Sequence, residues 1–385
     1  MKVRTLVIAA SLGGGGAERV ITTLLRNLDR RRFDLHLALV DASGPYLSRI
    51  PPDVTVHDLR ARRVRYALLP ILRLVRRLQP SVALSTLGYL NLAVIAARPL
   101  WPAGTRLWVR EANIPSASLP EAPRSRLLQW LYPRLYPRAD GIVCASEGIR
   151  DDLVDGFRIP PAKTKVIVNP VDTEAIRHQT GQDESPLPGA GPHLVAAGRL
   201  TRQKGFDLLL RAVSPLIHQR RQIHLTILGA GPEKTALGRL AESLKISDSV
   251  SMPGFVDNPY SYFRAADLFI LSSRWEGLPN VVLEALACGT PVVGFDCSGG
   301  GVREIARETE EVVLVPPNDV PTLTVAIREN LERKNASSSP PLLPARFQIE
   351  SVVKRYEEVL LGEGLSWTED TGFKRMVRPE GFSGR

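Results

Sequence analysis

Sulfur is scarce in this chain of 385 residues, which has three methionines and three cysteines. The cysteines, Cys144, Cys288 and Cys297, are spaced neither as a disulfide framework nor as a zinc site. We therefore expect a reducing compartment, with three thiols that act as small buried hydrophobic side chains.

Long apolar runs are also lacking, and no uninterrupted apolar segment is long enough to span a bilayer. The run at residues 6–10 follows Lys2 and Arg4 as in a signal peptide, but it is short and soon gives way to four glycines. We interpret it as a first buried strand. The expected location is the cytoplasm, and peripheral attachment to the inner face of the plasma membrane stays open.

Aromatic residues make up 6% of the chain and occur without any nucleic-acid reader motif, so no nucleic-acid partner is expected. Positive charge, in contrast, is in excess, with a formal net charge of +10. This balance favours polyanionic partners such as phosphates or anionic lipid headgroups. No Asp-x-Asp sequence occurs, and we expect no metal site and no cofactor.

Two successive α/β patterns organise the chain, joined by a segment rich in Gly, Pro, Asp, Glu and Ser at residues 179–192. Short apolar strands separated by amphipathic helices predict parallel, doubly wound sheets. We expect an α/β protein with two Rossmann-like domains facing a cleft, where ligands bind beyond the carboxyl ends of the strands. The predicted units are domains at 1–175 and 193–345, a linker at 176–192, a C-terminal helix at 346–361 and a poorly ordered tail at 362–385. The predicted strands are 3–9, 35–40, 82–85, 107–110, 141–146, 193–197, 223–228, 268–271 and 291–295, and the predicted helices are 17–28, 206–217, 233–244, 280–287 and 348–361.

The glycine run at residues 13–16 lies between the first strand and its helix. Glycines let backbone N–H groups approach an anion closely, and a helix N-terminus adds a favourable dipole. The run matches neither the dinucleotide fingerprint nor a Walker A sequence, so an anion site and a plain tight turn both stay open.

A second strand-to-helix junction carries G-R-L-T-R-Q-K-G at residues 198–205. Arg199 offers a planar fork of donors and Lys204 a mobile point charge, which are two complementary ways to hold a diphosphate. A solvated basic loop is the alternative, and the position at the mouth of a sheet favours the phosphate site.

The third motif is E-G-L-P-N-V-V-L-E-A at residues 276–285. It places Glu276 just before a helix that Pro279 can open, and Glu284 inside that helix. Carboxylates accept hydrogen bonds from vicinal sugar hydroxyls, and the helix start offers free N–H groups. A pair of acids that merely stabilises the helix dipole is the alternative.

Together these motifs resemble those of the retaining GT-B glycosyltransferases, and more narrowly of the GT4 family. Glu276 and Glu284, with seven residues between them, are similar to the family's EX7E motif. Residues 198–205 resemble its diphosphate site, residues 15–19 its GGAER loop, and V-N-P-V-D at 168–172 its interdomain segment. The resemblance covers roughly residues 1–330 in order, and four motifs in register are far more specific than any one.

The resemblance implies a GT-B hexosyltransferase that needs no metal and retains the anomeric configuration. It would move a hexose or N-acetylhexosamine from a UDP- or GDP-linked donor to a glycan or polyprenyl-linked acceptor in surface polysaccharide synthesis. Arg199 and Lys204 would neutralise the leaving diphosphate, and Glu276 would face the transferred sugar. The implied donor-binding residues are Gly15, Gly16, Gly229, Gly231, Phe255, Val256, Gly277, Leu278 and Glu284, the last of these on the ribose.

On the acceptor side, R-E-A-N at residues 110–113 resembles a segment of family members that act on bacterial surface polysaccharides and lipid-linked sugars. Arg110, Glu111 and Asn113 are therefore the acceptor-side candidates. The alternative is that Arg110 and Glu111 simply pair with each other. The glycine run at 299–301 differs from relatives that carry a proline there, which leaves the geometry of this loop open.

One stretch of the N-terminal half is strongly basic and carries no acid between its arginines, while leucine, isoleucine and valine interleave with them. This pattern is typical of a basic amphipathic surface for an anionic leaflet, to which residues 124–138 could add. An ordinary surface helix with its apolar face in the core is an equal alternative. The arginines are Arg60, Arg62, Arg63, Arg65, Arg73, Arg76 and Arg77.

Other functions remain to be distinguished from glycosyl transfer. A nucleotide-sugar epimerase with the same fold would turn over the donor alone. A basic, non-catalytic binding protein would have no use for intact copies of Arg199, Lys204, Glu276 and Glu284.

Overall fold

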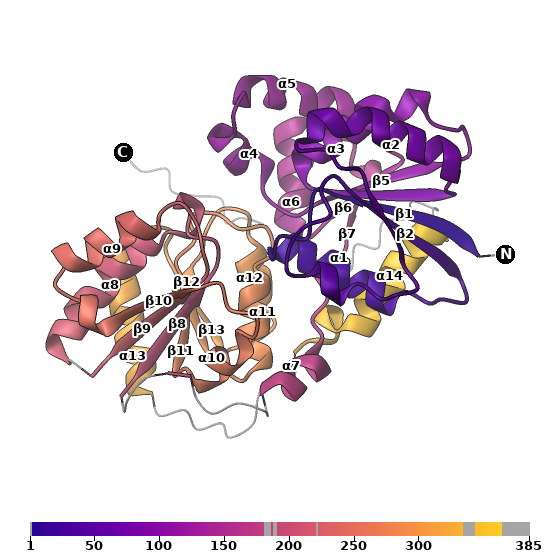
Figure 1. Cartoon of the computed structure of the whole chain (residues 1–385). Helices are drawn as coiled ribbons and strands as arrows, with labels where there is room; N and C mark the ends of the chain where they lie inside the picture. The colour runs from indigo at the N-terminus through magenta and orange to yellow at the C-terminus, as the bar shows by residue number, and fades with distance from the viewer. Residues whose placement is uncertain (1, 181–185, 188–190, 221, 334–342, 364–385) are drawn as a thin grey trace, which may run out of the picture.

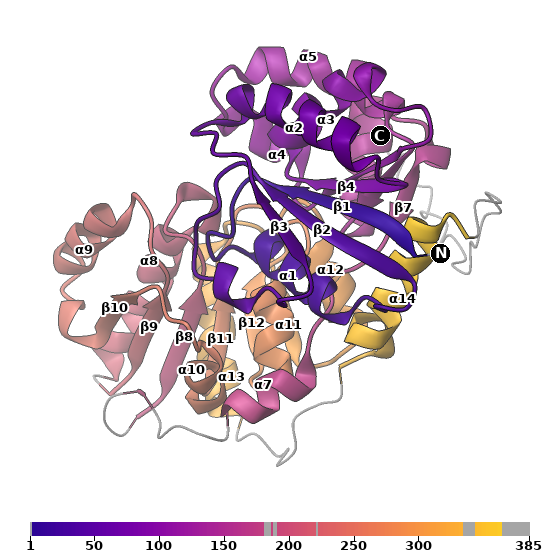
Figure 2. The same ribbon diagram turned by 45° about the vertical axis from the view of Figure 1, so that its right-hand side comes forward.

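The computed structural model describes residues 2–180, 186–187, 191–220, 222–333 and 343–363. They form two parallel sheets, each covered by helices on both faces (Figures 1 and 2). The chain therefore has the doubly wound α/β architecture that its alternating pattern predicts. Residues 364–385 of the expected tail lie outside the described residues.

The N-terminal sheet has seven parallel strands in the order β3-β2-β1-β4-β5-β6-β7. Helices α2, α3 and α5 lie on one side of it, and α1 and α14 on the other (Figures 1 and 2). Its strands are β1 (Val3–Ala9), β2 (Phe33–Leu39), β3 (Thr55–Asp58), β4 (Val82–Thr86), β5 (Arg106–Glu111), β6 (Gly141–Cys144) and β7 (Thr164–Val166). Its helices are α1 (Gly16–Asn27), α2 (Val64–Leu78), α3 (Gly88–Ala97), α4 (Pro115–Ser118), α5 (Ser125–Leu135), α6 (Glu147–Asp151) and α14 (Ile349–Leu361).

The C-terminal sheet has six parallel strands in the order β10-β9-β8-β11-β12-β13. Its strands are β8 (His193–Ala197), β9 (His224–Leu228), β10 (Val250–Gly254), β11 (Leu268–Leu271), β12 (Val292–Phe295) and β13 (Val312–Val315). Its helices are α8 (Phe206–Gln219), α9 (Lys234–Ser243), α10 (Tyr260–Ala265), α11 (Asn280–Ala287), α12 (Gly301–Ala306) and α13 (Val320–Glu332). Helix α7 (Thr173–Thr180) packs against α10 and α11, and it occupies the first residues of the segment expected to be a linker.

Four strands were not predicted, namely β3, β7, β10 and β13, and all four form outer edges of the two sheets. β3 is largely exposed and β7 has only three residues, so neither produces the apolar run of a buried central strand. The central strands β1, β8 and β11 have the predicted bounds, because burial on both faces makes them continuously apolar.

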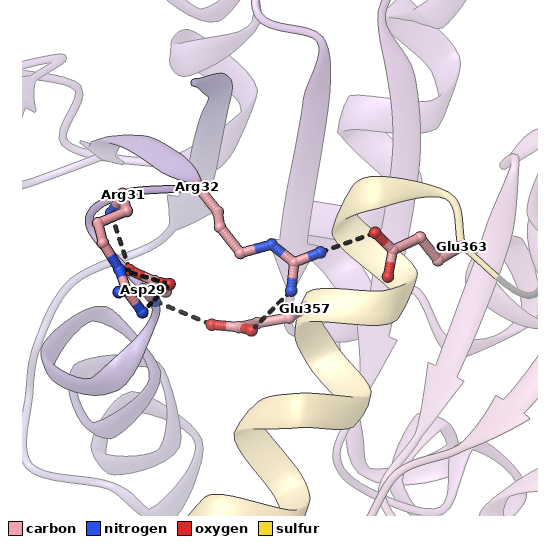
Figure 3. A network of polar contacts seen from close by, with 5 residues as sticks. All are labelled: Asp29, Arg31, Arg32, Glu357 and Glu363. Carbon is pink, nitrogen blue, oxygen red and sulfur yellow. Dashed lines mark hydrogen bonds and ion pairs between the residues drawn. The ribbon is translucent and has the colours of Figure 1, made fainter. Parts of the chain in front are cut away.

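The C-terminal helix returns to the N-terminal domain, where charged side chains fix it to the loop before β2 (Figure 3). Arg32 pairs with Glu357 at 3.4 Å and with Glu363 at 2.7 Å, while the backbone N–H of Asp29 donates to Glu357 at 2.9 Å. The apolar face of α14 buries Val352, Val353, Tyr356, Val359 and Leu360. The chain thus crosses twice between the two sheets, once at each end of the C-terminal domain.

Candidate functional site

Lys204 and Glu276 meet beyond the carboxyl end of β8. Nζ of Lys204 lies 2.5 Å from Oε1 of Glu276, and the hydroxyl of Ser273 donates to the same oxygen at 2.6 Å. Glu276 is buried, and the methylenes of Lys204 lie against Gly198, where an added Cβ would be 3.0 Å from Lys204 Cε. The turn is possible because Gly205, which follows Lys204, has a φ of +60°. Two segments that the sequence analysis treated separately therefore form one charged pair.

Arg199 projects from the same loop toward the glycine run of the other domain. A Cβ added to Gly15 would lie 3.5 Å from Nη2 of Arg199 and 2.5 Å from Oε2 of Glu18. The side chain of Arg199 is exposed, and among the residues that the structure describes it makes no ion pair. The guanidinium of Arg199 and the glycine loop thus meet across the domain boundary, beside the carboxylate of Glu18, and a guanidinium without an ion-pair partner is suited to an anion.

The segment from Glu276 to Glu284 is held by close backbone contacts that only glycine permits. A Cβ added to Gly277 would lie 2.3 Å from the carbonyl oxygen of Ala112 in the N-terminal domain, and one added to Gly301 would lie 1.7 Å from that of Gly277. The N–H of Glu276 donates to the carbonyl of Ser298 at 3.0 Å. The glycine run at 299–301, whose geometry was left open, therefore packs directly under the motif.

Glu284 is the second acid of this motif, and its main partner comes from the opposite domain. Arg19, on α1, forms an ion pair and a hydrogen bond with Oε1 of Glu284. Nε of Arg19 also donates to the hydroxyl of Tyr46 at 2.9 Å, and Nη1 donates to the hydroxyl of Tyr260 at 3.3 Å. Arg19 belongs to the GGAER loop but was not among the predicted site residues, because nothing in the sequence shows where its side chain ends.

A chain of amides joins the two domains beside this pair. Asn169, between β7 and α7, donates to Oδ1 of Asn280 at 2.5 Å, and Asn280 donates to the carbonyl of Gly16 at 3.0 Å. Asn169 also donates to the carbonyl of Leu278 at 3.3 Å. The buried side chain of Asn169 is thereby linked to two predicted donor residues, to Leu278 directly and to Gly16 through Asn280.

The loops expected near the nucleotide base lie next to the glycine loop. A Cβ added to Gly14 would be 2.9 Å from Cε2 of Phe255, whose ring is 47% exposed and free to receive a stacking partner. Gly229 donates to the carbonyl of Gly254 at 2.8 Å, and a Cβ added to Gly231 would lie 2.3 Å from the carbonyl oxygen of Leu200. Val256, the last predicted residue here, is half-buried beside Phe255.

The three acceptor-side candidates have different surroundings. Arg110 is fully buried and donates to the hydroxyl of Tyr356 on α14 at 3.0 Å and to Oδ1 of Asn169. Arg110 and Glu111 do not pair with each other, because neighbouring side chains of a strand point to opposite faces. Asn113 is half-buried, and its Oδ1 accepts from the N–H of Ile114 at 3.0 Å.

Glu111 is buried beneath the loop that follows β4. It accepts hydrogen bonds from Tyr136 at 2.5 Å and Tyr132 at 3.1 Å, and these two rings stack with their centroids 4.4 Å apart. Burial raises the pKa of the Glu111 carboxyl, against the opposing effect of the two phenols. The carboxyl group of Glu111 is thus bonded to two tyrosines inside the N-terminal domain, whereas its backbone lies at the end of β5 that faces the other domain.

Tyr89 is a site residue that the sequence analysis missed. Its ring is 52% exposed at the start of α3, and burial of its hydroxyl together with nearby Glu18 raises the pKa of Tyr89 while Arg199 lowers it. The preceding Leu87 has a φ of +78°, a costly conformation for a non-glycine residue. The strained residue at the end of β4, together with the electrostatic influence of Glu18 and Arg199 on Tyr89, makes this loop a candidate part of the interdomain site.

Glu304, on α12, is a second titratable group at the domain boundary. It accepts a hydrogen bond from the N–H of Gly148 on α6 at 3.2 Å, and burial raises the pKa of its carboxyl to about 7. Glu304 could not be predicted from the sequence, since its partner Gly148 lies 156 positions away. Among the described residues, no group of three or more His, Cys, Asp or Glu side chains is arranged to hold a metal ion, and no helix is long and apolar enough to cross a bilayer.

Comparison with known families matches both domains in turn. Residues 14–175 match the model described as Glycosyltransferase Family 4, and residues 191–333 match that described as Glycosyl transferases group 1. These two segments contain the glycine loop, the loop with Arg199 and Lys204, and both acids of the third motif.

Named relatives extend this similarity over most of the chain. The N-acetylgalactosamine-N,N'-diacetylbacillosaminyl-diphospho-undecaprenol 4-alpha-N-acetylgalactosaminyltransferase of Campylobacter jejuni is 31% identical over 334 residues, which cover 84% of this chain and 88% of that protein. The amylovoran biosynthesis glycosyltransferase AmsD of Erwinia amylovora is 23% identical, covering 92% and 98%. The crystal structure of HepE from Anabaena in complex with UDP and glucose has a similar fold, with a TM-score of 0.75, 19% identity and coverage of 93% and 99%.

Proposed function

The chain belongs to the family 4 glycosyltransferases, and on this premise we propose that it transfers a hexose or N-acetylhexosamine from a UDP- or GDP-sugar with retention and without a metal ion. The acceptor is a glycan or a polyprenyl-linked sugar of the cell envelope. The proposal is supported above all by one observation: Arg199 reaches the glycine loop of the other domain, and Lys204 from the same loop as Arg199 pairs with Glu276.

The leaving group of the reaction is a nucleoside diphosphate, on which negative charge develops as the sugar departs. Arg199 would bind its phosphates as a fork and Lys204 as a point charge, while N–H groups of Gly15 and Gly16 approach from the opposite side. Donors fixed in place before the reaction stabilise such charge at little reorganisation cost. In the proposed mechanism these side chains do the work that a metal ion does elsewhere.

Glu276 would hold the transferred sugar. Its Oε1 is engaged by Lys204 and Ser273, which fixes the carboxylate next to the phosphate-binding residues. Hydroxyls of the sugar can bond to Oε2, and the N–H groups of Gly277 and Leu278 add donors. Holding the sugar and the acceptor hydroxyl on the same face as the departing diphosphate accounts for retention.

The nucleoside part of the donor would lie along the C-terminal domain. Glu284 would accept from the ribose hydroxyls, and the exposed ring of Phe255 would pack against the base, with Val256, Gly229 and Gly231 shaping the loops around it. The HepE complex contains UDP and glucose, and its similar fold supports a nucleotide sugar in this chain as well.

The acceptor would bind on the side of the N-terminal domain. Glu111 and Asn113 lie at the end of β5 and just after it, and the loop of Tyr89 follows β4. Asn113 is the candidate whose side chain is accessible, whereas Arg110 and Glu111 would act by shaping the surface from behind. The relative from Campylobacter jejuni is named for a diphospho-undecaprenol acceptor, which supports a lipid-linked sugar here.

Such an acceptor lies in a membrane, and we propose that the face carrying α2 and α5 contacts the inner leaflet. Ala67, Ile71, Leu74 and Val75 of α2 pack into the core, so one part of this helix is an ordinary buried face. Its arginines are exposed, however, and so are four large apolar side chains of α2 and α5: Tyr66, Leu69, Leu127 and Trp130. Arginines mixed with exposed Leu and Trp suit an anionic interface.

The test is incubation of the purified chain with a panel of UDP- and GDP-sugars, each alone and with undecaprenyl-diphosphate-linked saccharides. We expect one donor to raise the melting temperature, and the same donor to extend a lipid-linked acceptor by one sugar, as seen by mass spectrometry. Conversion of the donor alone into an epimer would instead support an epimerase. Binding of no nucleotide sugar would reject the proposal.

A further inference from the structure

The ion pair between Arg19 and Glu284 leaves one carboxylate oxygen without a partner. Arg19 engages Oε1, whereas Oε2 is buried and has no hydrogen-bond partner among the described residues. A buried polar atom without a partner is unfavourable, so this oxygen calls for a bound group. Because a carboxylate can only accept, that group must be a donor such as a hydroxyl, and a phosphate oxygen does not fit.

We propose that Arg19 is a positioning residue for nucleotide recognition, which holds Glu284 so that Oε2 faces a ribose hydroxyl of the donor. The inference rests on the proposed function, since it takes Glu284 as the ribose-binding acid. It adds that ribose recognition is built from both domains, because Arg19 comes from α1 and Glu284 from α11.

The surroundings of Arg19 leave its guanidinium little freedom. Its Cζ lies 5.7 Å from the ring centroid of Tyr46 and 5.8 Å from that of Tyr260, and both hydroxyls accept hydrogen bonds from it. Tyr46 and Tyr260 are themselves buried. Because the planar guanidinium is held between two rings and bonded to both hydroxyls, it approaches Glu284 from one fixed direction.

Arg19 also stays protonated and positively charged. Burial acts against it, but the carboxylate of Glu284 and the neighbouring phenols together raise the pKa of Arg19 above its ordinary value. Glu284 therefore always has a cation at Oε1. An uncharged residue at position 19 would leave both oxygens to compete for the same ligand hydroxyls and would remove the constraint on the carboxylate plane.

The location of the pair supports a ligand and not a purely structural bridge. Arg19, Tyr46, Tyr260 and Glu284 are among the residues that line one pocket between the domains, together with Pro170 and Val171 of the interdomain segment and further residues of α1 and α7. A structural ion pair at this depth would be expected to satisfy both carboxylate oxygens from protein groups. Here the unsatisfied oxygen belongs to the same acid that the EX7E pattern assigns to the ribose.

The experiment compares nucleotides that differ only in the ribose. Calorimetric Kd values are measured for UDP and GDP and for the 2′-deoxy and 3′-deoxy analogues of whichever binds the natural chain more tightly. A hydrogen bond to a charged group contributes about 1.5–3 kcal/mol, so loss of the hydroxyl on Oε2 should weaken binding by about ten- to a hundredfold. In Arg19→Met, the same comparison should give a difference of less than about threefold.

Arg211→Met is the control, because it removes an exposed arginine that does not line the pocket of Arg19 and should keep full ribose discrimination. Arg19→Lys keeps the positive charge but lacks the forked guanidinium, and it should keep part of the ribose discrimination. Tyr46→Phe and Tyr260→Phe, which delete single hydroxyls, should reduce discrimination in a folded protein even if Arg19→Met melts early. Melting curves of all variants accompany the binding data.

Four results would overturn the inference. Full ribose discrimination in Arg19→Met would mean that Arg19 does not orient the acid, and tighter nucleotide binding in that variant would mean that Arg19 blocks the site. Binding of UDP or GDP by the natural chain without any preference for ribose would also overturn it, yet would leave the donor site standing. Failure of the natural chain to bind either nucleotide would reject the proposed function and this inference together.

Discussion

The ammonium of Lys204 donates a hydrogen bond of 2.5 Å to the carboxylate of Glu276, a residue 72 positions further along the chain. This contact joins the loop after β8 to the segment before α11, so the cation assigned to the diphosphate and the acid assigned to the sugar are neighbours. A donor bound here would have its scissile bond beside both groups, which is why the pair is central to the proposed transfer.

Removal of either phosphate-binding cation should slow the chemical step. We expect Lys204→Met and Arg199→Met to lower kcat at saturating donor by at least about a hundredfold, on the order of 3 kcal/mol of lost charge stabilisation. Lys234→Met, at an exposed position of α9, is the matched control and should be active. Turnover close to normal in either Lys204→Met or Arg199→Met would show that the leaving group is stabilised elsewhere.

Asn169 should act on the donor without touching it. Asn169→Ala removes the bonds to Asn280 and Leu278 and leaves the buried guanidinium of Arg110 with fewer partners. We expect the KM for the donor to rise about tenfold while kcat changes less, because the glycine loop and the start of α11 lose their common anchor. Steady-state kinetics with the donor varied would measure this, and an unchanged KM would contradict it.

Arg110 has the surroundings of a residue that stabilises the fold. It is fully buried between Asn169 and Tyr356, so Arg110→Met should lower the melting temperature by several degrees, as expected for a loss of about 1–3 kcal/mol. Tyr356→Phe, which removes one of these bonds, should cause a smaller decrease. A normal melting temperature together with a raised acceptor KM would instead restore Arg110 to the acceptor site.

Stability should depend on pH through Glu304. Burial raises the pKa of this carboxyl to about 7, so the folded state holds its proton at pH values where the unfolded chain has released it. The stability it contributes is therefore fully present below the unfolded pKa, near 4.5, and is lost as the pH rises through about 7.

Thermal melts at pH 5.0 and 7.5 test this dependence. Glu304→Gln keeps an acceptor for the N–H of Gly148 but cannot ionise, so the decrease in melting temperature between the two values should be smaller than in the natural chain. Glu310→Gln, at an exposed position, should behave like the natural chain. Identical decreases in all three proteins would rule out Glu304 as the group responsible.

Membrane attachment should require both parts of the proposed surface. Flotation with vesicles of anionic phosphatidylglycerol should recover the natural chain at low salt and less of it at high salt or with neutral phosphatidylcholine. Combined Arg62→Gln, Arg73→Gln and Arg77→Gln, or Trp130→Ala alone, should reduce recovery. The control replaces three exposed arginines of the other domain, namely Arg211, Arg239 and Arg307. Equal recovery of this control and of the variants on α2 and α5 would argue against membrane contact through that face.

The sequence predicted the fold because the fold depends on local patterns, and the prediction of the site residues rests on patterns of the same kind. Apolar runs marked the buried central strands, and the spacing of Glu276 and Glu284 around Pro279 was visible in one segment. Arg19 and Asn169 could not be placed, since their partners lie 265 and 111 positions away and only the packing of two domains brings them together. Tyr89 could not be distinguished from a core aromatic before its exposure was known.

The most direct test of retaining, metal-independent transfer is the anomeric configuration of the product formed in the presence of excess EDTA. A donor with an α-linked sugar, incubated with the chain and a lipid-linked acceptor, should give a product whose anomeric proton has the small NMR coupling of an α-linkage, at an unchanged rate. A β-linked product, or activity that disappears with EDTA and returns with a divalent cation, would contradict the account.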